Sequence, residues 1–224
     1  MRFLAAKITV MAILLIRHGE TMGNRDRVLQ TPETPLSDRG LVQASKLAKR
    51  LEGEEIGQIL SSDFARAHMT ANAISTLKGL VVHFEPLLQE RSFGDLRGLR
   101  YADLKEDPFG PEYTPPGGES WDDFYIRADR AWERIQETAQ KVTGHLVVVT
   151  HGLVLHSIAS RRLELPEAAV PGGSEEAGLP LQFRNTALTV VDSSPPWKVR
   201  VLGCAAHLDV EDEAIDGAGG ISGL

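Results

Sequence analysis

Residues 12–21 read Ala-Ile-Leu-Leu-Ile-Arg-His-Gly-Glu-Thr, an apolar run that stops at a charged pair. A short apolar run of this kind is typical of a strand buried within a parallel sheet. Arg17 and His18 stand where this strand is predicted to end. In open α/β sheets, ligands bind beyond the carboxyl ends of the strands. The stretch therefore predicts a buried strand that carries Arg17 and His18 to a ligand site.

The same arrangement recurs late in the chain, where residues 147–152 read Val-Val-Val-Thr-His-Gly. Each of the two histidines, His18 and His151, is followed by glycine at the end of an apolar strand. If the two strands are neighbours in the sheet, the histidines face each other. One His-Gly pair is more typical of an ordinary turn, but two in matching contexts, one beside an arginine, indicate a functional site.

Strands and helices alternate along the rest of the chain. The patterns predict further strands at 56–60, 80–84, 146–149, 187–191 and 199–202, and helices from Ser37 to Gly53, after Asp63, at 124–138 and at 152–162. Ser61, Ser62 and Asp63 are expected to cap the second of these helices. Residues 109–118 are rich in proline and glycine and are predicted to form a loop. The alternating order favours a three-layer α/β/α sandwich with a mostly parallel central sheet.

Length and composition favour one domain. The 224 residues suit a single domain over 11–208, with 1–10 as an N-terminal extension ahead of the second methionine. Residues 209–224 combine acidic residues with glycines, so we expect a flexible tail there. The apolar run ahead of Arg17 is much shorter than the ~20 residues of a membrane helix, so no membrane association is expected. The single cysteine, Cys204, points to a reducing, cytoplasmic location.

Charge narrows the class of ligand. The formal net charge is −7, which gives no basic surface to hold a nucleic-acid backbone. An anionic ligand therefore needs a local cluster of cations, and the arginine beside His18 is the first candidate for such a cluster.

Four blocks of the sequence resemble the histidine phosphatase superfamily, also called the phosphoglycerate-mutase-like family. They occur in that family's order and span about residues 12–205, nearly the whole chain. The blocks are Arg17-His18-Gly19-Glu20-Thr21 with Asn24, Ser61-Ser62-Asp63-Phe64-Ala65-Arg66-Ala67, Glu90-Arg91-Ser92-Phe93-Gly94-Asp95-Leu96-Arg97-Gly98, and Thr150-His151-Gly152. The resemblance implies a phosphoglycerate-mutase-like fold and a covalent phosphohistidine intermediate.

The resemblance also implies the catalytic roles. His18 matches the nucleophile, and Glu90 matches the group that protonates the leaving oxygen and later activates water. Arg17 and Arg66 offer forked donors that fit phosphate oxygens. His151 is expected to be protonated and to donate to the transferring phosphoryl group. Cations around His18 favour its neutral, nucleophilic form.

Four further residues are candidates for substrate binding. Asn24 matches the family's phosphate-contacting asparagine. Gln30 and Thr31 fall where many members have a Gln-Gly or Thr-Gly pair, and Thr31 stands in the place of that glycine. A side chain therefore occupies space that glycine would leave open. Gly152 follows His151 at the predicted start of a helix.

The remaining histidines and the possibility of a metal site lead to different predictions. His68, His83, His145 and His156 are interpreted as structural, and the role of His207 near the pocket stays open. A cluster of His18, His151 and Glu90 resembles a His₂Glu zinc set. Because two arginines in the same pocket would repel a dication, we expect neither a metal nor another cofactor.

Three functions remain open. The favoured function is hydrolysis of a small phosphate monoester, a phosphorylated metabolite; the alternatives are a cofactor-dependent phosphoglycerate mutase and a catalytically silent phosphate-binding module. The mutases carry cations after the Glu-Arg block, whereas residues 99–118 hold two basic residues against four acidic ones here. His18, Glu90 and His151 are all present, which argues against the silent module. A homodimer is an open alternative to a monomer.

Overall fold

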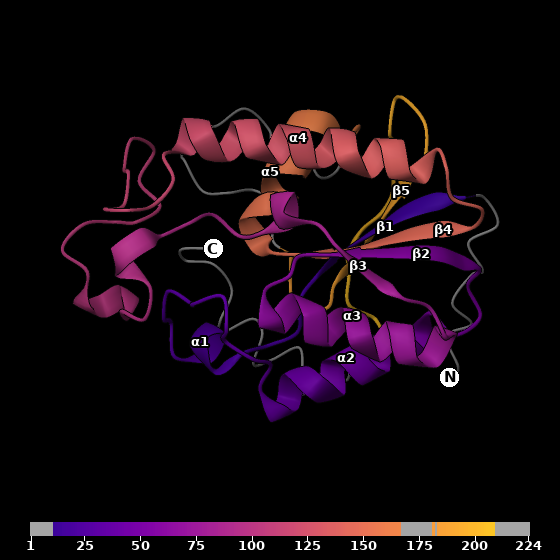
Figure 1. The fold of residues 1–224 in the computed structure, drawn as a ribbon, viewed down its shortest axis with the longest axis horizontal. Coiled ribbons are helices and arrows are strands. Elements are labelled where there is room, and N and C mark those ends of the chain that lie inside the picture. The colour runs from indigo at the N-terminus through magenta and orange to yellow at the C-terminus, as the bar shows by residue number, and fades with distance from the viewer. Residues whose placement is uncertain (1–10, 167–180, 182, 209–224) are drawn as a thin grey trace.

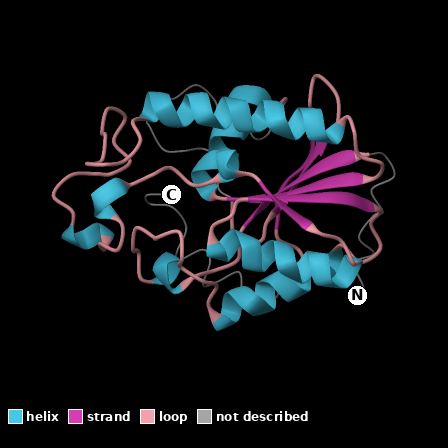
Figure 2. Cartoon of the chain, viewed as in Figure 1, coloured by secondary structure: helices cyan, strands magenta, loops and turns pink. Residues whose placement is uncertain are grey.

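The computed structural model describes residues 11–166, 181 and 183–208, which form a six-stranded sheet with helices on both faces (Figure 1; Figure 2). The strands are β1 (Ala12–Arg17), β2 (Ile56–Ser61), β3 (Val82–Phe84), β4 (His145–Thr150), β5 (Leu188–Asp192) and β6 (Val199–Cys204). They are ordered β3-β2-β4-β1-β5-β6. The predicted extension at 1–10 and the predicted tail at 209–224 lie outside the described residues.

Two layers of helices cover the sheet. The α-helices are α1 (Met22–Arg25), α2 (Asp38–Arg50), α3 (Ala65–Lys78), α4 (Trp121–Ala139) and α5 (Gly152–Arg162), and the short 3₁₀ turns are η1 (Pro86–Leu88), η2 (Gly94–Leu96) and η3 (Tyr101–Asp103). Figure 1 shows α2 and α3 on one face of the sheet and α4 and α5 on the other. The three-layer α/β/α sandwich predicted from the alternating pattern is therefore confirmed.

The central strand β1 contributes side chains to two hydrophobic cores, one on each face of the sheet, because successive side chains of a strand point to opposite faces. Ile13 and Leu15 pack into the core beneath α4 and α5. Leu14 and Ile16 pack into the core beneath α2 and α3. Burial on both faces explains why this strand is an unbroken apolar run in the sequence.

The sheet is mostly parallel, as expected. β1 and β2 both run parallel to β4, and β3 runs parallel to β2. β5 is antiparallel to β1, and β6 is antiparallel to β5. In the β1/β4 register, Arg17 lies opposite Thr150, so the residues that follow these two strands emerge side by side.

The structure confirms one predicted helix cap and contradicts another. The hydroxyl of Ser37 caps α2 by accepting from the N–H of Gly40. The expected cap of α3 was wrong, because this helix starts at Ala65 and its N-cap, Phe64, makes no side-chain capping bond. Ser62 bonds to His151 and Asp63 accepts from Gln89, so their side chains are engaged elsewhere.

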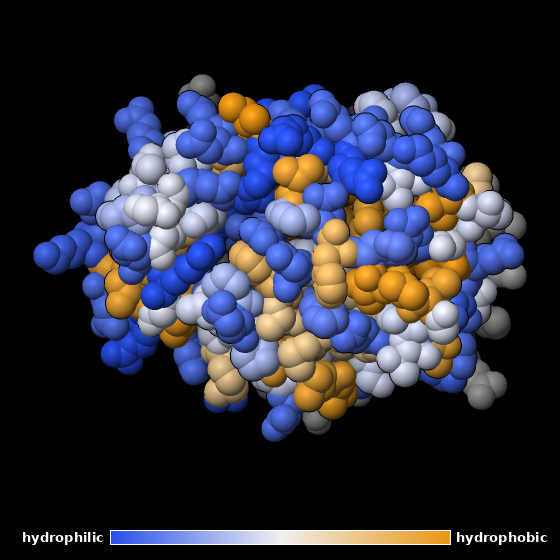
Figure 3. All heavy atoms as spheres, viewed as in Figure 1, coloured by the Kyte–Doolittle hydropathy of each residue, from blue (hydrophilic) through white to orange (hydrophobic). Residues whose placement is uncertain are grey.

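The surface on the side seen in Figure 1 is largely hydrophilic. Figure 3 shows an apolar area over the edge strand β3, where Val81 and Phe84 are exposed. No helix in the described part of the chain is both long and apolar enough to cross a membrane.

Candidate active site

Three parallel strands end at one edge of the sheet and deliver the candidate residues there. The N–H of His18 donates to the carbonyl of Thr150 at 3.0 Å, and the N–H of Ser62 donates to the carbonyl of Val149 at 3.0 Å. These two bonds continue the hydrogen-bonding pattern between the strands into the residues that follow β1 and β2. They bring the segment after β1, the segment after β2 and the end of β4 against one another.

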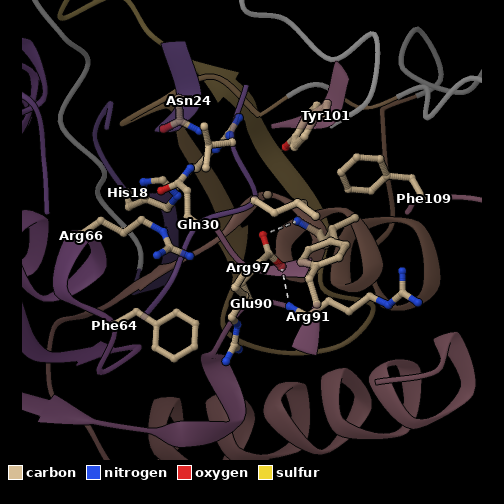
Figure 4. A pocket seen from close by; sticks show the side chains of 16 residues that line it. His18, Asn24, Gln30, Phe64, Arg66, Glu90, Arg91, Arg97, Tyr101 and Phe109 are labelled. Atoms are coloured by element: carbon tan, nitrogen blue, oxygen red, sulfur yellow. Dashed lines mark hydrogen bonds between the residues drawn. The ribbon is translucent and has the colours of Figure 1, made fainter. Parts of the chain in front are cut away.

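A cavity opens at this edge of the sheet (Figure 4). The space between its walls, with the open solvent at its mouth included, is about 550 Å³. Its lining comes from the end of β1, helix α1, the starts of α3 and α5, and the loops that follow α1 and β3. The lining residues are Arg17, His18, Asn24, Val28, Leu29, Gln30, Phe64, Arg66, Glu90, Arg91, Phe93, Arg97, Tyr101, Phe109, Gly152 and Leu153.

His18 is held as a neutral imidazole with a defined tautomer. Its Nδ1 lies 2.7 Å from the carbonyl oxygen of Gly19, and because a carbonyl only accepts, Nδ1 carries the hydrogen. The lone pair of the neutral ring is then on Nε2. Burial, followed by the charges of Arg66 and Arg17, holds the pKa of His18 well below the usual value for histidine. The side chain is therefore a neutral nitrogen base in a cationic cavity.

His151 lies beside His18 and is completely buried. The two ring centroids are 5.2 Å apart, and Nε2 of His151 shares a 2.8 Å hydrogen bond with the hydroxyl of Ser62. Burial and the charge of Arg66 hold the pKa of His151 well below its usual value. The structure thus favours a neutral His151, in contrast to the protonated form expected from the sequence, and His151 is not among the described residues that line the cavity.

Among the described residues, four arginines line the cavity, and the charges of two of them, Arg17 and Arg66, act on His18. Arg17 ends β1, and its Nη1 donates to the carbonyl of Phe183 at 2.7 Å. Arg66 lies in the first turn of α3 and is 3% exposed; its Nη1 donates to the carbonyl of Thr31 at 2.9 Å. Burial lowers the pKa of Arg66 to about 10, so the group stays charged at neutral pH. Thr31 acts here through its backbone, and its side chain is not part of the described cavity wall.

Glu90 is a buried carboxyl at the cavity wall. Its Oε1 accepts from the N–H of Arg91 at 3.0 Å, and its Oε2 accepts from the N–H of Leu153, in the first turn of α5, at 3.2 Å. Burial raises the pKa of Glu90 in spite of these two bonds and the nearby arginines. The environment therefore favours the protonated acid more than water does.

The loop that carries Glu90 is fixed from the opposite helix layer. Nη1 of Arg127, on α4, donates to the carbonyls of Leu87 and Gln89, and its Nη2 donates to the carbonyl of Glu90 itself. Glu119 accepts from the same guanidinium and forms an ion pair with it. Arg127 thereby sets where the Glu90 backbone lies.

Two amide side chains face the cavity as donors. Oδ1 of Asn24 accepts from the N–H of Thr21 at 3.1 Å, and Oε1 of Gln30 accepts from the hydroxyl of Thr21 at 2.9 Å. With both oxygens turned toward Thr21, the NH₂ groups are the ends of these amides that can meet an anion. Gly152 also lines the cavity, and an added Cβ there would make only an ordinary 3.6 Å contact with Arg17.

The structure adds residues that the sequence did not single out. Arg97, Tyr101 and Phe109 line the cavity. The segment that contains them is held by Arg91, whose guanidinium donates to the carbonyls of Pro108, Tyr113 and Glu119. The Glu-Arg motif in the sequence is the signal that could have indicated this role of Arg91.

The remaining histidines do not join the cavity wall in the described residues. His207 contacts Arg50 and the hydroxyl of Thr186, and His68 packs edge-on against Phe84. No group of three or more His, Cys, Asp or Glu residues within the described ranges is placed to hold a metal ion.

Comparison with known proteins places the chain among relatives over nearly its whole length. The family model of the histidine phosphatase superfamily (branch 1) matches residues 13–195. Phosphoglycerate mutase-like protein 4 of Arabidopsis thaliana is 33% identical, with 98% of this chain and 96% of that protein covered. A probable phosphoglycerate mutase of Photorhabdus laumondii is 31% identical, with 89% and 96% covered.

Solved structures give the same fold. A putative alpha-ribazole-5'-P phosphatase of Escherichia coli superposes with a TM-score of 0.74 at 29% identity, covering 88% of this chain and 98% of that one. A mycobacterial glucosyl-3-phosphoglycerate phosphatase, solved with VO₃, gives 0.67 at 26% identity, covering 87% and 100%. The relatives thus include proteins named as phosphatases and proteins named as mutases.

Proposed function

Because this chain belongs to the histidine phosphatase superfamily, we propose that it hydrolyses small phosphate monoesters through a phosphohistidine at His18. The observation that carries the proposal is the state of His18: its Nδ1 is bound to the Gly19 carbonyl, which leaves the Nε2 lone pair in a cavity lined by Arg17 and Arg66. Such a cavity attracts a phosphate dianion and presents a neutral nucleophile to it.

In the first step, the Nε2 lone pair of His18 forms a bond to phosphorus while the bond from phosphorus to the leaving oxygen breaks. The protonated carboxyl of Glu90 gives its proton to that oxygen, and the alcohol departs. Arg17 and Arg66 neutralise the three non-bridging oxygens throughout. Burial and the charge of Arg66 lower the pKa of His151, whereas the charge of a bound dianion raises it. We therefore expect His151 to take up a proton when the ester binds and to donate to the phosphoryl group.

In the second step, the carboxylate of Glu90 takes a proton from water as the water oxygen attacks phosphorus. The bond from phosphorus to Nε2 breaks, and its electron pair returns to His18. Inorganic phosphate leaves, and Glu90 is again protonated. The cycle closes without any other group, so activity without a metal or cofactor is part of the proposal.

Hydrolysis is favoured over mutase activity by the segment that closes the cavity. A mutase must hold a substrate with a carboxylate besides its phosphate, which calls for cations on the far wall. Here residues 99–118 contribute the rings of Tyr101 and Phe109 to the cavity lining and carry more acidic than basic residues, and a cation on this side of the lining, Arg97, precedes that segment. Mutase activity is kept as the second candidate because relatives bear that name. The cytoplasmic location and the homodimer stay predictions.

The experiment that tests this function measures inorganic phosphate released from a panel of phosphate monoesters, together with the conversion of 3- to 2-phosphoglycerate. Release of phosphate that disappears in His18→Ala supports the proposal. His83→Ala, a change at an exposed histidine on β3, is the matched control and should keep full activity. Interconversion of the phosphoglycerates without phosphate release would favour the mutase. Phosphate binding without any turnover would favour the silent module.

A further inference from the structure

Tyr101 stands at the cavity wall with a hydroxyl that the proposed mechanism does not use. No hydrogen bond joins this hydroxyl to another of the described residues, although the side chain is only partly exposed. Figure 4 shows the hydroxyl directed into the cavity. A phenol both donates and accepts, so a group in this position is ready for a polar partner from a ligand.

The ring of Tyr101 is held firmly in this place. It packs edge-on against Phe109, with the ring centroids 5.5 Å apart, and the guanidinium carbon of Arg27 lies 5.4 Å from the ring centroid. The backbone is fixed as well, because the N–H of Tyr101 donates to the carbonyl of Arg27 at 2.8 Å. The hydroxyl is therefore presented by a preorganised side chain.

Tyr101 lies on the side of the cavity where the organic part of a substrate must go. Figure 4 shows His18, Arg66, Asn24 and Gln30 on one side of Glu90, and Tyr101 with Phe109 on the other. In the proposed mechanism the phosphoryl group meets His18 and the leaving oxygen meets Glu90. The atoms attached to that oxygen then extend toward Tyr101.

A second hollow adjoins the first and shares the wall made by Tyr101 and Phe109. Its polar lining pairs two basic side chains, Arg27 and Lys105, with two acidic ones, Glu106 and Asp107, besides apolar residues. Formal charges balance there, so the hollow does not select a second anionic group. A neutral organic part with hydroxyl groups suits both the phenol and this polar lining.

We infer that Tyr101 is a specificity-determining residue whose hydroxyl binds a hydroxyl group on the organic part of the substrate, so that the protein prefers phosphorylated polyols to plain alkyl phosphates. This inference rests on the proposed function for the orientation of the ester. It concerns one oxygen atom, and a substitution that removes only this atom can test it.

The variant is Tyr101→Phe, which keeps the ring against Phe109 and Arg27. The substrates are glycerol 1-phosphate and propyl phosphate, which share a three-carbon chain and differ in the hydroxyls. We expect kcat/KM for glycerol 1-phosphate to fall about tenfold, the usual effect of one lost hydrogen bond in a binding site, and kcat/KM for propyl phosphate to stay unchanged. Tyr125→Phe removes the same atom from α4, outside the described cavity lining, and should change neither value.

Equal losses for both substrates, or no loss for either, would overturn the inference. Calorimetric titration of the His18→Ala protein with the two phosphates separates this inference from the proposed function, because binding is then read without turnover. A tighter Kd for glycerol 1-phosphate that disappears when Tyr101→Phe is added supports the subsite even if no ester is hydrolysed. If both esters are hydrolysed, bind with the same Kd and are unaffected by Tyr101→Phe, the proposed function is supported and the inference about Tyr101 is refuted.

Discussion

Replacing Glu90 by glutamine should slow the cleavage of esters with poor leaving groups far more than that of esters with good ones. An alkoxide leaves badly without a proton, whereas p-nitrophenolate leaves unaided. General acid catalysis is typically worth about 10²–10⁴-fold, and this loss should appear with an alkyl phosphate. With p-nitrophenyl phosphate the phosphoryl-transfer step should change little.

The structure also sets the stability cost of this substitution. Each oxygen of Glu90 accepts one backbone N–H, from Arg91 at 3.0 Å and from Leu153 at 3.2 Å. A glutamine retains one of these acceptors and turns an NH₂ group toward the other donor. The loss of one such bond and the resulting unpaired N–H cost about 1–3 kcal/mol, which leaves a domain of ordinary stability folded.

The assay is a rapid-quench measurement of the burst of alcohol released before steady state, because Glu90 would also act in the second step and steady-state rates mix the two. Glu137→Gln, the same change at an exposed position of α4, is the matched control and should leave both bursts intact. Equal losses of burst rate for the alkyl and the aryl ester in Glu90→Gln would refute the acid role and move it to His151.

Three further predictions concern charge, pH and metals. Arg66→Ala should lower kcat/KM for alkyl and aryl esters alike, by about 10²–10³-fold, as for other buried donors to a transition state. The control is Arg200→Ala, a change at an exposed arginine of β6, which should leave kcat/KM for both esters unchanged. A loss confined to one ester class would argue against charge neutralisation by Arg66. The pKa values of His18 and His151 are lowered in the folded protein and ordinary in the unfolded chain, so the unfolded chain binds more protons below about pH 6.5. The free energy of unfolding should therefore fall as the pH drops, by up to about 1.4 kcal/mol per pH unit for each histidine. Urea unfolding between pH 7 and 5 measures this slope, and a slope unchanged in the His18→Ala, His151→Ala double variant would contradict it. Turnover should survive exhaustive treatment with EDTA, and a loss that one added metal restores would show that a dication serves the cavity.

The sequence predicts the main strands and the meeting of the two histidines because these depend on local patterns. The apolar run of β1 and the Val-rich run of β4 each end at a histidine, and their parallel pairing brings the two rings within 5.2 Å of each other. Ser37 likewise caps α2, because its hydroxyl accepts from the N–H of Gly40 while it donates to Glu20, so the two bonds are compatible.

Other features depend on contacts between distant segments and could not be predicted from local patterns. Ser62 looks like a helix cap, yet its hydroxyl bonds to a histidine 89 positions away. Arg127 looks like a surface residue of an amphipathic helix, yet its guanidinium donates to the carbonyls of Gln89 and Glu90 and so orients the Glu90 loop. Tyr101 and Phe109 lie at the cavity in a segment that is held by long-range bonds, from the N–H of Tyr101 to the carbonyl of Arg27 and from the Arg91 guanidinium to the carbonyls of Pro108 and Tyr113.

The most direct test of the account is to trap the phosphorylated protein and find the residue that carries the phosphate. Acid-free rapid quench of wild type during turnover of a ³²P-labelled phosphate ester, followed by peptide mapping, should give label that is stable to base, labile to acid and located at His18. His18→Ala should give no such label, and Glu90→Gln should accumulate it, because hydrolysis of the intermediate would then lack its base. Label on a serine or on His151, or turnover with no labelled residue at all, would contradict the account.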